Sequence, residues 1–466
     1  MPDKKKVAEK QRQRTLETLR TAEEVTRLPA VVPPVAYPIE TLVPEARQQT
    51  PAVGQRATRV DGRLHGLGQT RYIDDLAFPG MLHARIKRAG IASARIVRID
   101  TSAAEAMPGV MAVLTGREIP VNSFGATLQD QPVLADERVS HAGDGVAAVA
   151  AVTEQIATEA LETIKVEYEP LPAVFDPLEG LKEDSQKVHP PHSNIYATKA
   201  IRKGDVEKGF AASDRIFEGR FRTQMVEHVS LEPHAAIADW DPNGRLTVWS
   251  TLGRITLGRA DLARTLKLPM SRIHVIATIV GGNFGGKNEI TQEPVLALLS
   301  RKAGRPVKGV FTRGDEFIST TTRHPFIMDY KTGVTRDGRI LARKVRLVLD
   351  GGAYCSFSET TLGKACILAS GPYKIENLLV EAFAVYTNKT VAGAMRGFGA
   401  PQTCFAYESH MDDIAAALGL DPLDIRLLNA FDEGSASPTG QVLQSVVVKQ
   451  SLLKAAERFG WKEAGQ

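Results

Sequence analysis

The stretch VGGNFGGKNE, residues 280–289, has the residue types and spacing of a loop that binds a charged group. From Gly281 it matches the phosphate-loop pattern of glycine, four residues, glycine and lysine, but Asn288 stands where that pattern has serine or threonine. The missing hydroxyl normally holds the magnesium of a bound nucleotide. The glycines still allow backbone amides to approach an anion or a metal oxo group, because no Cβ blocks the way.

A second glycine-rich stretch, AGAMRGFGAPQ, covers residues 392–402. It places Arg396 and Phe398 among small residues, which would expose both side chains. The alternative for either stretch alone is a tight turn, in which Phe398 packs in the core and Arg396 forms a surface salt bridge. Two such stretches in one chain favour a binding site.

The surrounding patterns place each glycine loop between a strand and a helix. RIHVIATIV, residues 272–280, predicts a strand before the first loop, and ITQEPVLALLSRKAG, residues 290–304, predicts a helix after it. VEAFAVYTN, residues 380–388, and TCFAYESHMDDIAAALG, residues 403–419, predict the same order around the second loop. Strand-to-helix turns are common ligand sites, so we expect a site between the two loops.

The chain divides into three predicted regions. Residues 1–53 form a polar and proline-rich tail, in which residues 1–27 favour a polar helix; we interpret the tail as a segment that docks on a partner or stays mobile. Residues 54–176 alternate short strands with an amphipathic helix, which indicates a mixed α/β domain. Residues 177–466 carry both glycine loops and form the second domain.

Composition excludes several classes of protein. The 466 residues are 43% hydrophobic and 24% charged, which is typical of a globular chain with ample core. The 58 basic and 54 acidic residues nearly balance, so nucleic-acid binding is not expected. No apolar run reaches the roughly 20 residues of a membrane span, and the amino terminus lacks the apolar core of a secretory signal. We therefore expect a cytoplasmic protein.

Only three cysteines occur, Cys355, Cys366 and Cys404, and none belongs to a CxxC pair. They are too few for the four thiolates of an iron–sulfur cluster, and their spacing matches no zinc site. We expect them to be buried free thiols.

Together these stretches resemble the molybdenum-binding large subunit of the xanthine dehydrogenase and aldehyde oxidase group of molybdenum hydroxylases. The resemblance covers about residues 54–460 and rests on GQTRYIDDLAFPGMLHAR, YEPLPAV, GGNFGGK, DGGAY, MRGFGAPQ and ASPTGQVL in that order. TTLGKACILASGPYKIEN and ASPTGQVL are most similar to the branch that hydroxylates nicotinate, purines and related N-heterocycles. The implied fold is α+β: an N-terminal α/β hammerhead-type domain, then the first molybdopterin-binding domain, with the second half expected on another chain.

The resemblance also implies a cofactor and site residues. The cofactor would be a molybdenum–pterin group, in the form of molybdopterin cytosine dinucleotide, with no direct protein ligand to the metal. Residues near the metal's oxygen and sulfur ligands would be Gly282, Asn283, Phe284, Gly285, Gly286, Arg396 with its amide, and Gly397. Phe398 would stack on a flat substrate, and Lys364 and Asn288 would lie at the substrate pocket.

Several positions depart from the family pattern. Many relatives have a glutamine where Leu252 stands here, or Gly253 if the alignment shifts by one residue. Asn288 and Lys364 replace the glutamate and arginine of xanthine-oxidising relatives, which weakens xanthine as a substrate. Glu232, in LEPHAA, is expected to have a supporting role, because the family's base glutamate belongs to the second half.

The implied activity is insertion of a water-derived oxygen at an electron-poor carbon of an N-heterocycle, nicotinate- or purine-like. The expected partners are a second molybdenum-binding subunit with the base glutamate, an FAD subunit, a [2Fe–2S] subunit and a small-molecule substrate, so the chain alone would be inactive. The alternatives are an aldehyde oxidoreductase subunit, an aromatic acyl-CoA dehydroxylating reductase subunit, and a catalytically silent assembly subunit.

Overall fold

The computed structural model describes residues 58–461, which fall into two compact units. The unit that ends at Thr70 contains the short helix α3 (Gly62–Gly66) in its described part. The unit that begins at Arg71 holds both glycine loops. The predicted tail of residues 1–53 and its helix lie outside the described residues. In the described part of the chain, no helix combines the length and apolar character needed to span a bilayer.

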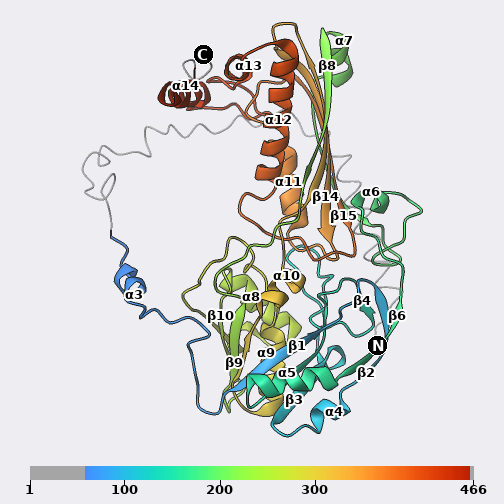
Figure 1. Ribbon diagram of the computed structural model, residues 1–466, viewed down its shortest axis with the longest axis vertical. Helices are drawn as coiled ribbons and strands as arrows, with labels where there is room; N and C mark the ends of the chain where they lie inside the picture. Colours follow the sequence, from blue (N-terminus) through green and yellow to red (C-terminus); the bar gives the residue numbers. More distant parts are fainter. Residues whose placement is uncertain (1–57, 462–466) are drawn as a thin grey trace. The chain divides into compact units, whose positions relative to one another are not determined.

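The larger sheet of the second unit has seven strands and mixes parallel with antiparallel pairs (Figure 1). In spatial order its strands are β11 (Ile273–Ala277), β10 (Leu246–Ser250), β9 (Ala235–Trp240), β12 (Val307–Val310), β1 (Leu82–Arg88), β5 (Gly145–Ala151) and β3 (Val110–Thr115). β1 pairs with β12 in parallel and with β5 in antiparallel register. Strands from both sides of the predicted domain boundary at Asp176 therefore share one sheet; the boundary itself stays a prediction.

Helices cover both faces of this sheet, and this explains why its strand β5 is apolar along its length. α9 (Glu293–Ala303) packs on one face with α8 (Ile255–Thr265), and α5 (Glu154–Thr163) packs on β1 and β5. β5 reads GVAAVAA, and six of its seven residues are buried. A strand without a solvent face is expected to be apolar along its whole length. α5 begins at a capping threonine, because the Thr153 side chain accepts a hydrogen bond from the Ile156 amide.

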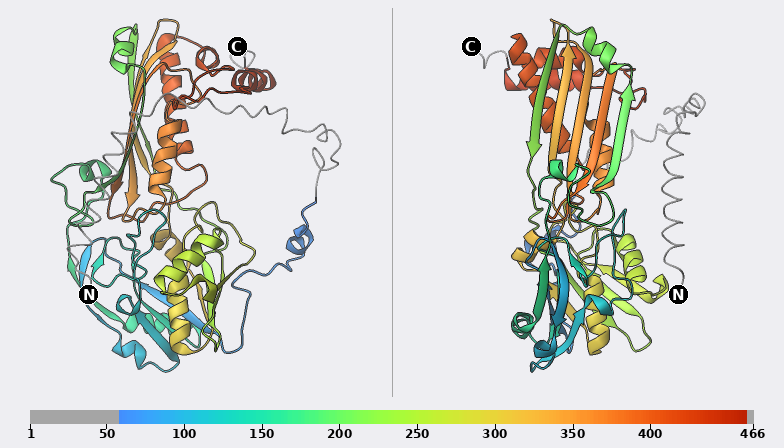
Figure 2. Two further views of the ribbon diagram at one scale, coloured as in Figure 1. Left: turned by 180° about the vertical axis from the view of Figure 1, so that it is seen from behind. Right: turned by 90° about the vertical axis from the view of Figure 1, so that its right-hand side faces the viewer.

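The second sheet has five long strands with two helices along one face (Figure 2). In spatial order the strands are β7 (Ile195–Lys203), β15 (Asn377–Tyr386), β14 (Ile340–Gly352), β13 (Phe326–Val334) and β8 (Arg215–Thr223). α11 (Ser358–Leu368) and α12 (Ala400–Leu418) bury β14 residues such as Val345 and Leu347. α6 (Pro177–Gly180) and α7 (Val206–Ala211) pack against the opposite face, where Val348 and Ala342 lie.

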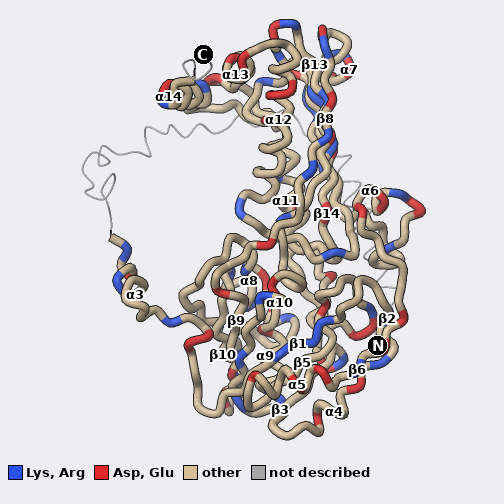
Figure 3. Tube along the Cα trace, viewed as in Figure 1, with Lys and Arg blue, Asp and Glu red and all other residues tan. Residues whose placement is uncertain are grey.

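A three-stranded antiparallel sheet and short elements complete the second unit, so the α+β prediction is confirmed. The small sheet contains β4 (Arg138–Val139), β2 (Ala94–Asp100) and β6 (Lys165–Pro170). The remaining helices are α4 (Ser102–Glu105), α10 (Arg313–Ser319), α13 (Pro422–Asn429) and α14 (Val448–Phe459), with 3-10 turns η3 (Gly116–Glu118) and η4 (Met270–Arg272). Lys and Arg are interspersed with Asp and Glu over both larger sheets (Figure 3).

Both glycine loops lie where the sequence predicts them, between a strand and a helix. The first follows β11 and precedes α9, and the second follows β15 and precedes α12. α12 begins after Gly399, at a φ of +85°, and ends at Gly419, at a φ of +68°. Glycine suits both ends because side chains rarely adopt a positive φ. These backbone positions determine where the second loop enters its helix.

Buried hydrogen bonds hold the loops after β14 and β15 against the hammerhead-type segment. The Tyr354 hydroxyl donates to Asp144 at 3.0 Å. The Asn388 side-chain amide donates to the Ser140 carbonyl at 2.8 Å. Because all four residues are buried, these bonds restrict how far the second glycine loop can move relative to the larger sheet.

The prediction that all three cysteines are buried is wrong for Cys404, which is exposed on α12. Another side of that helix packs on the sheet through Ala406 and Ile414. A helix on one face of a sheet must leave its other side uncovered, and Cys404 falls on that side. Cys355 and Cys366 are buried, and burial raises the pKa of the Cys366 thiol to about 11.

Candidate functional site

The first glycine loop, residues 281–287, adopts a backbone conformation that side chains would block. Gly282 and Gly285 have φ values of +112° and +111°, which glycine adopts without strain but residues with a side chain rarely adopt. A Cβ at Gly285 would lie 2.5 Å from the Ala394 carbonyl oxygen. Phe284, between them, has a left-handed φ of +50° and leaves half of its surface exposed. The glycines therefore allow a close approach between the two loops.

The tip of this loop presents unused backbone donors. Within residues 58–461, the amides of Gly282, Asn283 and Phe284 donate no hydrogen bond to protein. The next two amides turn back on Asn283: Gly285 donates to its side-chain oxygen and Gly286 to its carbonyl, each at 2.8 Å. Three consecutive amides thus remain for an outside acceptor, an arrangement that suits an anion.

Glu232 closes the first loop at both ends. Its amide donates to the Gly281 carbonyl at 3.1 Å, and its carboxylate accepts from the Gly281 amide at 2.7 Å. Lys287 Nζ donates to the Glu232 carbonyl at 2.7 Å and to the carboxylate at 3.1 Å. Burial lowers the pKa of Lys287, and the Glu232 carboxylate partly opposes this shift. Glu232 therefore joins the two ends of the first loop.

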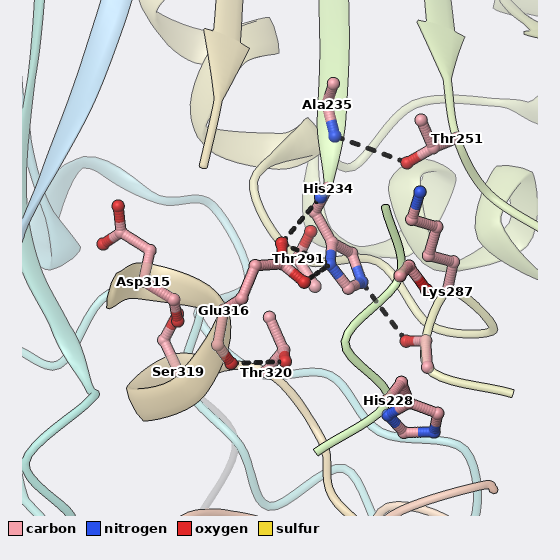
Figure 4. A network of polar contacts seen from close by, with 12 residues as sticks. His228, His234, Ala235, Thr251, Lys287, Thr291, Asp315, Glu316, Ser319 and Thr320 are labelled. Carbon is pink, nitrogen blue, oxygen red and sulfur yellow. Dashed lines mark hydrogen bonds and ion pairs between the residues drawn. The ribbon is translucent and has the colours of Figure 1, made fainter. Parts of the chain in front are cut away.

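A second buried pair, His234 and Glu316, contacts the loop at Gly286 (Figure 4). Glu316 accepts from the His234 amide at 2.6 Å and lies 2.9 Å from His234 Nδ1, while His234 Nε2 lies 3.2 Å from the Gly286 carbonyl. Burial opposes ionisation of Glu316, but the hydrogen bonds from His234 outweigh it and hold the pKa of Glu316 below its ordinary value. The result is a fixed position for Gly286.

The two glycine loops meet in the structure. The Arg396 amide donates to the Phe284 carbonyl at 2.8 Å, so this amide, which the resemblance places toward the metal, is engaged within the protein. His228 links the loops a second time, because Nε2 lies 2.8 Å from the Ala394 carbonyl and its ring fills the space beside Gly286. Burial lowers the pKa of His228. The two loops therefore form one surface.

Phe398 projects from the second loop and contacts Lys364, as expected for residues of one site. Phe398 has a left-handed φ of +49° between Gly397 and Gly399, at +106° and +85°. Its half-buried ring meets Phe357 edge to face, with centroids 6.2 Å apart. Lys364 Nζ lies 5.9 Å from the Phe398 ring centroid. The structure thus brings together two of the three residues predicted to meet substrate.

Arg254 and Phe357 lie at the same place, although neither belongs to the site predicted from sequence. The Arg254 guanidinium carbon lies 5.3 Å from the Phe357 ring centroid. A signal was present: Arg254 occupies the N-cap of α8, a position that favours serine, threonine, aspartate or asparagine. Phe357 carried no comparable signal.

Asn288, the third predicted substrate residue, lies beside Gly253. Its Oδ1 is 3.1 Å from the position of a Cβ at Gly253, and Asn283 Nδ2 would be 2.1 Å from that Cβ. Leu252 packs into the core of the larger sheet, so neither candidate position supplies the glutamine of many relatives. In the described part of the chain, no hydrogen bond joins Asn288 to Lys364.

Glu289 follows the first loop and ties it to two other segments. Its carboxylate accepts from the Ala126 amide at 3.1 Å and from the Ser356 hydroxyl. Burial raises the pKa of Glu289 to about 7, although both hydrogen bonds act in the opposite direction. Ser356 directly precedes Phe357, so this carboxyl connects the first loop to the ring that packs on Phe398.

Comparisons with known proteins identify the family of this chain. A family model described as a molybdopterin cofactor-binding domain matches residues 188–430, and one described as the a/b hammerhead domain of aldehyde oxidase and xanthine dehydrogenase matches residues 67–172. The chain is 39% identical over 408 residues to the nicotinate dehydrogenase large molybdopterin subunit of Eubacterium barkeri. It is 38% identical over 418 residues to a probable xanthine dehydrogenase subunit of Bacillus subtilis.

Two solved structures, 30% and 31% identical to this chain, have the same fold. The aldehyde oxidoreductase of Desulfovibrio gigas is 30% identical with a TM-score of 0.84, over 91% of this chain and 49% of that one. Quinoline 2-oxidoreductase of Pseudomonas putida 86 is 31% identical with a TM-score of 0.84, over 89% and 55%.

The extent of these matches differs between relatives. The matches to the two curated relatives each cover 87% of this chain, but 96% of the Eubacterium subunit and 56% of the Bacillus protein. The chain therefore spans nearly all of one relative and about half of others. It belongs to the aldehyde oxidase and xanthine dehydrogenase family of molybdenum-containing oxidoreductases and carries a molybdopterin cofactor-binding domain.

Proposed function

We propose that this family member is one molybdenum-binding subunit of a hydroxylase that acts on an electron-poor N-heterocycle, nicotinate- or purine-like. Each turnover would convert a ring C–H and one water into C–OH, two protons and two electrons. The electrons would leave through [2Fe–2S] and FAD groups on partner subunits. The observation that carries the proposal is the contact between the two loops, one of which has three free amides while the other carries the Phe398 ring.

The first glycine loop fits the molybdenum–pterin cofactor, which we infer is molybdopterin cytosine dinucleotide. When bound, this group supplies the two-electron oxidation and the activated water. The amides of Gly282, Asn283 and Phe284 would donate to its oxygen and sulfur atoms. Residues 281–286 contain no charged side chain, so backbone donors would make these contacts. Gly285, Gly286, Arg396 and Gly397 would hold that backbone in place through the contact between the loops.

Three side chains of this chain would meet the substrate. The Phe398 ring would stack on a flat heterocycle, which is favourable by roughly 0.5–1.5 kcal/mol beyond burial. Lys364, next to that ring, would stabilise negative charge that develops on a ring nitrogen or would hold a carboxylate. Asn288 would offer a neutral amide beside the loop. This set differs from a glutamate and arginine pair and so disfavours xanthine.

The proposed partners follow from the chemistry that this chain does not supply. The three cysteines of this sequence are fewer than the four thiolates of a [2Fe–2S] cluster, and we propose that a partner carries that cluster. A second molybdenum-binding subunit would contribute the base glutamate, and an FAD subunit would accept electrons. We propose a cytoplasmic location for the complex.

Co-purification from the native host tests the proposal. We expect a brown complex in which mass spectrometry identifies this chain, a second molybdenum subunit, an FAD subunit and an iron–sulfur subunit. Molybdenum should be equimolar with this chain. A complex of the same subunits without molybdenum would instead support a silent assembly subunit, and a single chain that hydroxylates substrate with an artificial acceptor would contradict the need for partners.

Aldehyde oxidation is the second candidate, because the fold matches the Desulfovibrio gigas aldehyde oxidoreductase as well as it matches quinoline 2-oxidoreductase. The purified complex separates the two. Faster turnover of aromatic aldehydes than of N-heterocycles would favour the second candidate. The reverse order would favour hydroxylation of the ring.

A further inference from the structure

Four side chains beside the second glycine loop form a continuous series of contacts. Arg254 lies over Phe357 at 5.3 Å, Phe357 meets Phe398 at 6.2 Å, and Lys364 lies 5.9 Å from Phe398. We call these four residues the ring–cation cluster. They come from the start of α8, the loop before α11, α11 itself and the second glycine loop. Four separate segments thus converge on one aromatic pair with a cation at each end.

Both cations of the ring–cation cluster lack a counterion. Within residues 58–461, neither the Arg254 nor the Lys364 side chain forms an ion pair with a carboxylate or donates a hydrogen bond, and both residues are exposed. Arg426 shows the contrast, since it pairs with Glu408 and Asp412. Two uncompensated positive charges at the ends of one aromatic pair leave a positive potential that an anion would neutralise.

Arg254 has no evident structural reason to be an arginine. It occupies the N-cap of α8 without making a capping hydrogen bond, and the first turn of α8 contains no acidic residue. The partial positive charge of a helix start disfavours a cation there. A position that breaks a local rule without a compensating hydrogen bond or ion pair is a candidate for a role outside folding. The interaction with the Phe357 ring orients the guanidinium but leaves its charge unpaired.

The cluster lies at the candidate site rather than elsewhere on the surface. Gly253, directly before Arg254, donates its amide to the Lys287 carbonyl at 2.6 Å and lies against Asn283 of the first loop. Phe398 belongs to the second loop. Two members of the cluster, Arg254 and Phe398, are therefore next to or part of the loops that would hold the cofactor.

We propose that the ring–cation cluster binds the anionic group of a flat aromatic substrate, with Arg254 as the residue that recognises its carboxylate. The planar guanidinium can donate two parallel hydrogen bonds to a carboxylate, which a lysine cannot do. Phe398 contacts the ring, the buried Phe357 orients both Phe398 and the Arg254 guanidinium, and Lys364 adds positive charge at the Phe398 end. The inference rests on the proposed function and narrows its substrate to aromatic carboxylates.

Binding of a matched pair of probes tests this assignment without turnover. Benzoate and benzamide have the same ring and nearly the same shape, but only benzoate is charged at neutral pH. Calorimetric titration of the native complex with each probe should show benzoate binding more tightly than benzamide. Arg254→Gln should weaken benzoate binding roughly 10- to 100-fold and leave benzamide binding nearly unchanged, because a charge-assisted hydrogen bond is lost.

Arg301→Gln is the matched control. Arg301 lies over the Trp240 ring at 5.1 Å, so it is also an exposed arginine on an aromatic ring, but on α9. This variant should bind benzoate as the wild type does. Equal benzoate binding by wild type and Arg254→Gln would overturn the inference, and so would the absence of benzoate binding by the wild type.

Molybdenum content, measured on the same samples, separates this inference from the proposed function. Loss of benzoate affinity in Arg254→Gln supports the carboxylate site whether or not the complex contains molybdenum. Full molybdenum content with no effect of Arg254→Gln overturns the carboxylate site and leaves the hydroxylase proposal intact.

Discussion

The two glycine loops share a backbone shape but differ in what supports them and what they present. Each has a phenylalanine in the left-handed region followed by a glycine at positive φ: Phe284 with Gly285, and Phe398 with Gly399. The first loop is held by the buried ion pair of Lys287 and Glu232 and has free amides at its tip. The second loop begins a 19-residue helix and presents a ring packed on another ring.

This difference shows how one local conformation serves two purposes. Free amides are useful to a ligand only if the loop cannot collapse to satisfy them internally, so the first loop needs rigid support on both sides. A side chain that contacts a ligand needs a fixed rotamer, and packing against Phe357 supplies it. Changes in the first loop should therefore affect stability and cofactor content, whereas changes in the second should affect substrate binding.

The largest effect is expected from Lys287→Met. This change removes the cation from a buried pair and leaves the Glu232 carboxylate without its partner, which should lower the free energy of unfolding by roughly 3–5 kcal/mol. Urea denaturation measures it. Lys302→Met is the control, because Lys302 and Glu118 form an exposed pair worth no more than about 1 kcal/mol. Equal losses in the two variants would show that the first loop does not depend on buried charge.

Glu289→Gln should change how stability depends on pH. The pKa of Glu289 is raised from 4.5 to about 7, so the folded protein binds its proton more tightly than the unfolded chain does. Stability should fall as pH rises from about 4.5 to about 7 and then level off. The variant lacks this fall, so relative to wild type it should gain roughly 3 kcal/mol between pH 4 and pH 8. A difference that does not vary with pH would contradict burial of this carboxyl.

Gly285→Ala should distinguish the effect of the close contact between the two loops from the effect of backbone strain at a positive φ. A Cβ at Gly285 meets the Ala394 carbonyl at 2.5 Å, whereas Gly304 also has a positive φ but no atom within 4 Å of an added Cβ. Gly285→Ala should therefore be less stable than Gly304→Ala by roughly 1–3 kcal/mol. Thermal denaturation gives this difference, and molybdenum content should fall only in Gly285→Ala. Similar behaviour of the two variants would mean that the contact between the loops is not needed.

Phe398→Ala is expected to have the smallest free-energy effect, and it acts on substrate. Loss of ring stacking of roughly 0.5–1.5 kcal/mol corresponds to a rise in KM of about two- to tenfold for an aromatic substrate, with molybdenum content unchanged. Phe284→Ala changes the equivalent ring of the first loop and should raise KM less. Steady-state kinetics on both variants, at full molybdenum content, shows which substitution raises KM more. A larger rise in Phe284→Ala would reverse the roles assigned to the two loops.

Local sequence was sufficient to predict the elements around the site. The alternation that predicts β11 and β15, and the helical patterns that predict α9 and α12, depend on residues close together in the chain. The positive φ values at Gly285 and Gly397 follow from the same local requirement for glycine. GGNFGGK and MRGFGAPQ, with the other stretches in order, were sufficient for the family.

Only the tertiary structure decided which side chains support the loops and which join them. Glu232, which binds Lys287 in the first loop, lies 55 residues before it in the chain. Arg254, at the start of α8, contacts Phe357, at the start of α11, although these helices pack on different sheets. The exposure of Cys404 likewise depends on which side of α12 faces the sheet. Neither periodicity nor a motif specifies such pairs, because a contact between distant residues depends on how complete elements pack, whereas a turn or a helix depends on its neighbours along the chain.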